Sequence, residues 1–192
     1  MPRILAFAGS ARRESFNKRL VTVAAEIARE RGAEVTLIDL NDFPMPLYHG
    51  DLEAADGVPA PAQRLYDLMK SHDGLLLACP EYNGSITPLL KNTLDWVSRR
   101  REGDPPLAAY TGKVAGLLAA SPGQGGGLRG LVHVRAILGN LGVLVLPGQV
   151  AVPAAADAFN DSGDLRDPGV QKRVMGVVEE LVRVTGRLAT HD

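Results

Sequence analysis

Residues 74–85 have the sequence GLLLACPEYNGS, in which an apolar run passes directly into a polar loop that contains proline and glycine. The apolar part, Gly74–Cys79, is short and has almost no polar residue, which is typical of a strand buried on both faces of a sheet. Pro80 ends the strand because it lacks a backbone N–H, and Asn83-Gly84 is a turn signal. The stretch therefore predicts a buried parallel strand with an exposed loop at its carboxyl end.

The same pattern recurs along the chain on both sides of this strand. Four further short apolar runs indicate strands: Arg3–Gly9, Glu34–Ile38, Lys113–Ala120 and Val143–Leu146. Apolar positions at helical spacing indicate five helices: Asn17–Arg31, Ala62–Ser71, Thr87–Arg100, Leu128–Leu138 and Pro168–Leu188. The segment Asn41–Pro61 is rich in proline, glycine and aspartate and is expected to be a long loop.

Strands that alternate with helices predict an α/β fold in which a parallel sheet carries helices on both faces. Two doubly wound strand orders are common at this size. The flavodoxin-like order, 2-1-3-4-5, suits five strands, whereas the dinucleotide-binding order usually has six. In both orders, ligands bind at the carboxyl ends of the strands. With 192 residues and a mass of 20.4 kDa, residues 1–192 are expected to form a single domain.

The composition excludes several classes of protein. The 21 basic and 22 acidic residues give a net charge of −1, so the chain has no positive field of the kind that nucleic-acid-binding proteins use. The one cysteine, Cys79, rules out a disulfide framework and a CxxC pair, and it is consistent with the cytoplasmic location that we expect. Glycines and prolines interrupt the longest uncharged stretch, residues 136–156, so no membrane-spanning helix is expected.

The loop after the first strand, residues 9–17 (GSARRESFN), predicts an anion site. Ser10, Ser15 and Asn17 offer short donors beside the free N–H groups of a helix start, where the helix dipole favours negative charge. Arg12 adds a guanidinium fork that suits phosphate. The loop matches neither GxxxxGK[ST] nor GxGxxG, so the terminal phosphate of a group such as FMN fits better than a bridging pyrophosphate. The alternative is that Ser15 or Asn17 only caps the helix.

The loops after the third and fourth strands predict the remainder of a ligand site. Pro80–Ser85 combines backbone amides, an amide side chain and the ring of Tyr82, as a flat heteroaromatic ligand requires. A plain strand–helix turn with Tyr82 in the core is the alternative. Residues 121–130 (SPGQGGGLRG) formally contain GxGxxG, but a dinucleotide site also needs an acidic residue about 20 positions later. Residues 105–156 contain no Asp or Glu, which leaves a glycine-rich loop over which a ring system could lie closely.

Taken together, Gly9-Ser10-x-Arg12-x-x-Ser15-x-Asn17, the PEYNGS stretch at 80–85, Leu90-Lys91-Asn92 and Asp95-Trp96 resemble the NAD(P)H-dependent FMN reductase family. That family includes bacterial quinone, azo and chromate reductases, and the resemblance covers essentially the whole chain. It implies a flavodoxin-like fold, non-covalently bound FMN and NAD(P)H as the co-substrate. It also implies a homodimer or homotetramer, with Thr87–Trp96 as a candidate interface helix.

The resemblance assigns cofactor contacts to matching positions of this chain. The 5′-phosphate of FMN would be bound by Ser10, Arg12, Ser15 and Asn17, with Phe16 packing nearby. The edge of the isoalloxazine ring would be lined by Pro80, Glu81, Tyr82, Asn83 and Gly84. Ser121 and Gly123 would close the other side.

The chemistry implied by the resemblance belongs to the flavin, so no side chain is expected to be catalytic. NAD(P)H would reduce FMN by hydride transfer, and a small acceptor (a quinone, azo compound, chromate or flavin) would then take its place in a ping-pong cycle. Two other classes are alternatives. A flavodoxin-like electron carrier usually has a strongly charged docking face, which this near-neutral chain does not indicate. A flavin-free scaffold protein could share the fold.

Other distinctive residues receive structural interpretations. Cys79 ends a buried strand, where a thiol is usually inert. Arg99–Arg101 end a helix, where cations are favourable, with contact to a cofactor phosphate as the alternative. Tyr48 and His49 lie in the long loop, from which they could cover the site of a neighbouring subunit. No metal site is predicted, because the four histidines have no ligand spacing: His49, His72, His133 and His191.

Overall fold

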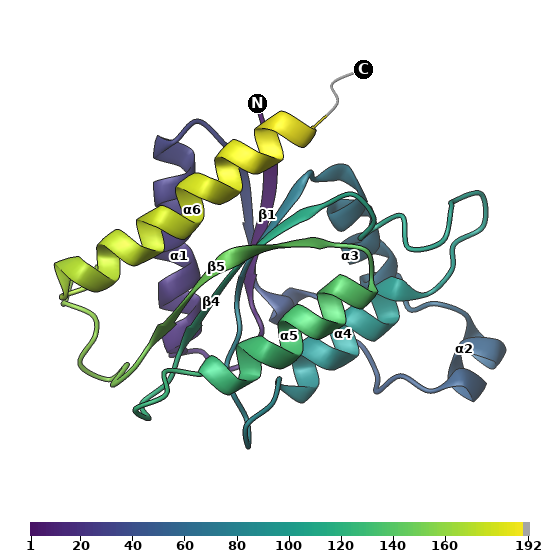
Figure 1. Ribbon diagram of the computed structural model, residues 1–192. Helices are drawn as coiled ribbons and strands as arrows, with labels where there is room; N and C mark the ends of the chain where they lie inside the picture. The colour runs from purple at the N-terminus through teal and green to yellow at the C-terminus, as the bar shows by residue number, and fades with distance from the viewer. Residues whose placement is uncertain (190–192) are drawn as a thin grey trace.

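Five parallel strands form one sheet in the order β2-β1-β3-β4-β5 (Figure 1). In this computed structural model, which describes residues 1–189, the strands are β1 (Arg3–Ala8), β2 (Glu34–Ile38), β3 (Gly74–Ala78), β4 (Val114–Ala120) and β5 (Leu144–Val152). The flavodoxin-like order is therefore confirmed and the six-stranded alternative is wrong. The apolar strand β3 lies in the middle of the sheet.

Helices cover both faces of the sheet (Figure 1). On one face lie α1 (Phe16–Glu30) and α6 (Pro168–Leu188), and on the other lie α3 (Ala60–Ser71), α4 (Pro88–Ser98) and α5 (Leu128–Asn140). Successive side chains of a strand point to opposite faces. Along β1, Ile4 and Ala6 therefore pack toward α1 and α6, whereas Leu5 and Phe7 pack toward the other three helices. None of the helices in residues 1–189 is long and apolar enough to cross a membrane.

The segment 41–61 is not the continuous loop that was predicted. It holds the end of a 3₁₀ helix (Leu40–Asp42) and the short helix α2 (Gly50–Asp56). His49 begins α2, because its Nδ1 accepts a hydrogen bond from the N–H of Leu52 at 3.2 Å. Helix α2 buries no side chain, so no apolar periodicity signals it in the sequence.

Strand β5 extends past the predicted end at Leu146 and continues through Pro147 to Val152. Proline is tolerated here because β5 is an edge strand and a register shift against β4 interrupts the ladder. The guanidinium of Arg135, on α5, donates to the carbonyl of Leu146 at 2.8 Å and to Oε1 of Gln149 at 2.9 Å. In the irregular part of β5, a backbone carbonyl thus receives its hydrogen bond from a side chain instead of from a neighbouring strand.

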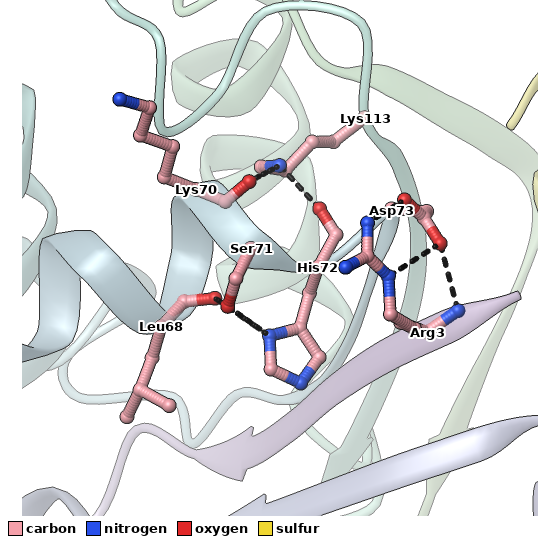
Figure 2. A network of polar contacts seen from close by, with 7 residues as sticks. All are labelled: Arg3, Leu68, Lys70, Ser71, His72, Asp73 and Lys113. Atoms are coloured by element: carbon pink, nitrogen blue, oxygen red, sulfur yellow. Dashed lines mark hydrogen bonds and ion pairs between the residues drawn. The ribbon is translucent and has the colours of Figure 1, made fainter. Parts of the chain in front are cut away.

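A polar network joins the amino ends of β1, β3 and β4 (Figure 2). Asp73 accepts hydrogen bonds from the backbone N–H of Arg3 at 2.8 Å and from its guanidinium at 3.1 Å. Burial raises the pKa of Asp73, but the hydrogen bonds from Arg3 outweigh burial and hold this pKa below its usual value. The ammonium group of Lys113 donates to the carbonyl of His72, where α3 ends, and burial lowers the pKa of Lys113 to about 8. This network lies at the end of the sheet opposite the loops that were predicted to bind a ligand.

Candidate functional site

Three loops lie next to one another: the first loop (residues 9–17, after β1), the second loop (residues 80–85, after β3) and the third loop (residues 121–130, after β4). They meet because these three strands are neighbours in the sheet and run in the same direction. In the view of Figure 1 they lie along the lower side of the sheet. A cavity of about 80 Å³ opens between them, and it is lined by Ser10, Arg12, Ser15, Phe16, Asn17, Pro80, Glu81, Tyr82, Ala120, Ser121 and Pro122. Nine of the twelve predicted cofactor-binding residues line this cavity, while Asn83, Gly84 and Gly123 lie outside it.

The size of the cavity restricts what it can hold. Pockets that enclose a whole small-molecule ligand typically measure about 300–1,000 Å³. A volume of about 80 Å³ is sufficient for a phosphate group and too small for a complete flavin. The cavity therefore fits the anionic end of such a ligand, and the remainder would lie over the neighbouring loops.

In the first loop, two buried hydroxyl groups lie beside the start of helix α1. Oγ of Ser15 caps α1 by accepting a hydrogen bond from the N–H of Lys18 at 3.4 Å, and Oγ of Ser10 accepts from the N–H of Arg12 at 3.3 Å. Each hydroxyl keeps its own proton for donation to a ligand. No acidic residue lies in the first turn of α1, so the positive end of the helix dipole is not neutralised. The capping interpretation of Ser15 is correct and is compatible with anion binding.

Arg12 and Asn17 differ in how far their side chains are already engaged. The guanidinium of Arg12 has no hydrogen-bond or ion-pair partner within residues 1–189, which leaves a charged fork at the rim of the cavity. Asn17 uses both ends of its amide on the last residue of β4. Its Nδ2 donates to the carbonyl of Ala120 at 2.8 Å, and its Oδ1 accepts from the N–H of Ala120 at 2.9 Å. Only one N–H of the Asn17 side chain remains for a ligand.

The second loop is a tight turn that exposes an aromatic ring. Tyr82 and Ser85 exchange backbone hydrogen bonds of 2.9 and 3.0 Å. Asn83 and Gly84 between them have φ values of 52° and 82°, and this left-handed conformation at both central positions is the one that Asn-Gly favours. Tyr82 is 49% exposed, so the alternative that places it in the core is wrong. The ring is available to stack on a flat ligand.

The carboxylate of Glu81 is directed toward α5. It accepts hydrogen bonds from the backbone N–H groups of Arg129 at 3.0 Å and Gly130 at 3.2 Å, and it forms an ion pair with the Arg129 guanidinium at 2.6 Å. Burial raises the pKa of Glu81. The hydrogen bonds from Gly130 and Arg129 and the charge of Arg129 together lower this pKa by more than burial raises it, so it lies below its usual value. Although Glu81 lines the cavity, its carboxylate is already occupied by the first turn of α5.

The glycines of the third loop have two different roles. A Cβ at Gly126 would lie 2.8–2.9 Å from backbone atoms at the end of β5, and one at Gly127 would lie 2.8 Å from Cβ of Ala119. Both residues also have positive φ, so the packing of the protein itself requires glycine there. In contrast, a Cβ at Gly125 would meet no atom within 4 Å, and one at Gly123 would meet only Oγ of Ser121 at 3.7 Å. Only this second pair fits the expectation of open space beside a ligand.

The remaining distinctive residues take structural positions. Burial raises the pKa of Cys79 to about 12, so the thiol stays protonated at neutral pH. Arg99 pairs with Glu53 on α2 at 3.0 Å, and the buried Arg101 donates to Oε1 of Gln63 at 2.6 Å. These contacts engage two of the three arginines for which contact with a cofactor phosphate is the alternative.

Two of the histidines also have local partners. His72 lies between the carbonyl of Leu68 and the hydroxyl of Thr36, and His133 is hydrogen-bonded to Ser85. His191 lies outside the described residues. Within residues 1–189 no group of three or more His, Cys, Asp or Glu side chains is arranged to hold a metal ion.

Two side chains that shape the site were not among the predicted residues. The hydroxyl of Thr87 donates to the carbonyl of Gly9 at 2.7 Å, and Arg129 is the partner of Glu81. Thr87 followed by Pro88 is a recognisable helix start. Its contact with Gly9 spans 78 positions of the chain, and no local sequence pattern indicates such a contact.

Comparison with known proteins identifies the family. Residues 2–157 match the family described as NADPH-dependent FMN reductase. The chain belongs to this family. The reductase is therefore an oxidoreductase with FMN as its flavin and NAD(P)H as its reductant, and the corresponding predictions are confirmed.

Individual relatives agree with this assignment. The reductase is 33% identical to an NAD(P)H-dependent FMN reductase of Pseudomonas aeruginosa over 180 residues, which cover 93% of this chain and 92% of that protein. It is 34% identical to the quinone reductase of Escherichia coli K12 over 144 residues, which cover 75% and 73%. Among solved structures, FerB, a flavoenzyme NAD(P)H:(acceptor) oxidoreductase from Paracoccus denitrificans, superposes with a TM-score of 0.82 at 27% identity, covering 97% of this chain and 98% of that one.

Proposed function

We propose that the reductase binds FMN at the carboxyl ends of β1, β3 and β4, with the 5′-phosphate in the 80 Å³ cavity. One observation carries the proposal: two buried hydroxyl donors, the uncompensated amino end of α1 and the guanidinium of Arg12, which has no partner within residues 1–189, surround the same small space. Ser10 and Ser15 would donate to phosphate oxygens, Arg12 would neutralise their charge, and Phe16 would pack beside them.

The isoalloxazine ring is proposed to lie between the second and third loops. Tyr82 offers a ring face, and the backbone of Pro80–Gly84 offers N–H and C=O groups to the polar edge of the flavin. Ser121 supports the other side. Its Oγ accepts a hydrogen bond from the N–H of Gly123 at 3.2 Å, so the hydroxyl proton is free for a ligand.

When bound, FMN would supply the redox chemistry of the site, the transfer of reducing equivalents from NAD(P)H to a second substrate. We propose a small acceptor of the quinone, azo, chromate or flavin type and a ping-pong cycle, in which NAD(P)H and the acceptor occupy the same open face in turn. The residues of the chain hold the cofactor, and none of them is assigned as a catalytic acid, base or nucleophile.

A second copy of the chain is the proposed cover for the open flank of this site. A hollow of about 500 Å³ between α4 and α5 adjoins the second loop and includes Ile86, Pro88 and Ile137. Leu128 and Val132, on α5, are 49% and 57% exposed. Apolar surface beside an incompletely enclosed ligand site fits a homodimer or homotetramer. Sedimentation velocity on the wild type and on Val132→Glu tests this proposal, and a wild-type protein that sediments as a monomer contradicts it.

The decisive experiment for the function has two stages. The purified protein is first examined for the absorbance spectrum of FMN and for thermal stabilisation by added FMN. NADH and NADPH oxidation are then measured with a quinone, an azo dye, chromate and free FMN as acceptors. Parallel lines in double-reciprocal plots support the ping-pong cycle. A protein that binds FMN but does not oxidise either nicotinamide supports the electron-carrier alternative, and one that does not bind FMN contradicts the proposed site.

A further inference from the structure

Three side chains join the three loops of the proposed site to one another. Asn17, in the first loop, is bonded to both backbone groups of Ala120, where the third loop begins. Thr87, directly after the second loop, donates to the carbonyl of Gly9, where the first loop begins. Glu81, in the second loop, accepts from the backbone N–H groups at the end of the third loop. Each pair of loops therefore has one tie, and the three ties close a ring around the cavity.

We propose that Asn17, Thr87 and Glu81 are positioning residues for FMN. They fix the spacing of the three loops in the apoprotein, so that the flavin binds a site that is already formed. The inference rests on the proposed flavin site and adds a role that differs from direct contact with the cofactor.

The partners of the three side chains support this role. Each tie ends on main-chain atoms, so it holds the backbone of the partner loop. Glu81 alone also pairs with a side chain, the guanidinium of Arg129. Asn17 and Thr87 are only 4% and 2% exposed. A hydrogen bond in such a poorly solvated place is electrostatically stronger than one at the surface, and leaving its partner unpaired is costly.

Loops that are already tied together are expected to lower the entropic cost of binding the flavin. A ligand that touches three separate loops must order them, and fixing the backbone of each residue costs conformational entropy. Loops that are tied together before binding have already met this cost during folding. Loss of a tie is therefore expected to weaken the binding of the whole flavin and not only of its phosphate.

The affinities of FMN and riboflavin together distinguish a positioning role of Asn17 from a direct contact with the phosphate. If the remaining N–H of Asn17 acted mainly on the phosphate, its removal would weaken the binding of FMN and leave riboflavin, which lacks the phosphate, unaffected. If Asn17 acts by fixing the spacing of the loops, both flavins lose affinity by the same factor. Arg12, whose side chain has no partner in the described part of the chain, serves as the comparison for a direct phosphate contact.

The test measures dissociation constants of FMN and riboflavin for the apoprotein by quenching of flavin fluorescence. Thr87→Val replaces the hydroxyl with a methyl group of similar shape, and Thr87→Ser keeps the hydroxyl. We expect Thr87→Val and Asn17→Ala, each of which removes two buried hydrogen bonds, to weaken the binding of both flavins by at least roughly tenfold. Thr87→Ser is expected to retain wild-type affinity, and Arg12→Ala to weaken FMN alone. The double variant Asn17→Ala/Thr87→Val is expected to lose less than the product of the single effects, because the two ties act on one unit.

Folding is monitored separately by urea unfolding of each apoprotein. Glu81→Gln, which keeps an oxygen for the N–H groups of Arg129 and Gly130, gives a milder third variant, and a smaller loss of affinity for both flavins is expected. Equal flavin affinities in the wild type, Thr87→Val and Glu81→Gln would overturn the inference while leaving the flavin site intact. An Asn17→Ala effect confined to FMN would also overturn it for that residue. Failure of the wild type to bind FMN would instead overturn the proposed function.

Discussion

The ring of Tyr48 stands edge-on against the indole of Trp96, with the ring centroids 5.0 Å apart and the ring planes at 88°. Nε1 of Trp96 donates to the carbonyl of Pro46 at 2.7 Å. Asn92, one turn earlier on α4, accepts from the N–H of Tyr48 at 2.8 Å and donates to the same carbonyl at 2.9 Å. The segment before α2 is thus anchored on α4 of its own chain. A role of Tyr48 and His49 at a neighbouring subunit's site stays a prediction.

Asn92→Ala is expected to release this segment. The variant removes two hydrogen bonds and leaves the N–H of Tyr48 without its partner, at a cost of about 1–3 kcal/mol. Trp96 is the only tryptophan of the chain and is fully buried, so the emission of the apoprotein reports directly on this contact. We expect a red shift of the emission and faster proteolysis between residues 41 and 59. Lys91→Ala, a change at the neighbouring exposed position, is the control and is expected to leave both measurements unchanged.

Arg12→Ala is expected to weaken FMN binding. A charge-assisted hydrogen bond contributes about 1.5–3 kcal/mol, which corresponds to a change of about 10- to 150-fold in the dissociation constant. The affinity of the wild type for FMN is also expected to fall as salt is added, and this salt dependence is expected to be smaller in the variant. Arg13→Ala is the matched control, because it removes the same charge from the adjacent position. Equal losses in the two variants would indicate a general electrostatic effect and would contradict a specific contact by Arg12.

Gly126→Ala is expected to destabilise the fold. The new Cβ would lie within 2.9 Å of backbone atoms of β5, and the residue would have to keep a φ of 61°. Overpacking typically costs about 1–3 kcal/mol, and the left-handed conformation adds about 1–2 kcal/mol. Urea unfolding measures the sum. Gly125→Ala, one position earlier and in open space, is expected to change the free energy of unfolding by less than about 0.5 kcal/mol.

Lys113 is expected to make stability depend on pH in the alkaline range. Its pKa is about 8 in the folded protein and 10.5 for the unperturbed group, so the unfolded chain binds more protons between these values. The free energy of unfolding contributed by Lys113 therefore rises as pH increases from about 8 to 10.5, by up to about 3 kcal/mol. Lys113→Met removes the titrating group. The difference between wild-type and variant stability, measured at pH 7 and pH 10, is expected to shift in favour of the wild type at the higher pH. A difference that is independent of pH would show that Lys113 keeps its ordinary pKa.

The sequence was sufficient to predict the sheet because its central strands are buried on both faces. Short continuous apolar runs such as Gly74–Cys79 are typical of buried parallel strands. Their alternation with helices leaves few possible topologies. Helix α2 was not predicted for the opposite reason: it buries no side chain, and its start depends on a cap by His49. The extension of β5 through Pro147 depends on Arg135, which belongs to a different element.

The same limit applies to the candidate site. Residue types and strand ends indicated where the loops meet, and nine of the predicted residues line one cavity. The sequence did not indicate which of these side chains are already committed to the protein. Asn17 and Glu81 are bonded to loops that follow more than 40 positions later, and such long-range contacts have no local pattern.

The division among the glycines of the third loop has a consequence for engineering. Gly126 and Gly127 are required by the strands behind them, whereas Gly123 and Gly125 face open space. A library confined to positions 123 and 125 would therefore change the wall beside the proposed flavin without altering β4 or β5. Substitutions there could then change the acceptor preference of a biocatalyst while its thermal stability is retained.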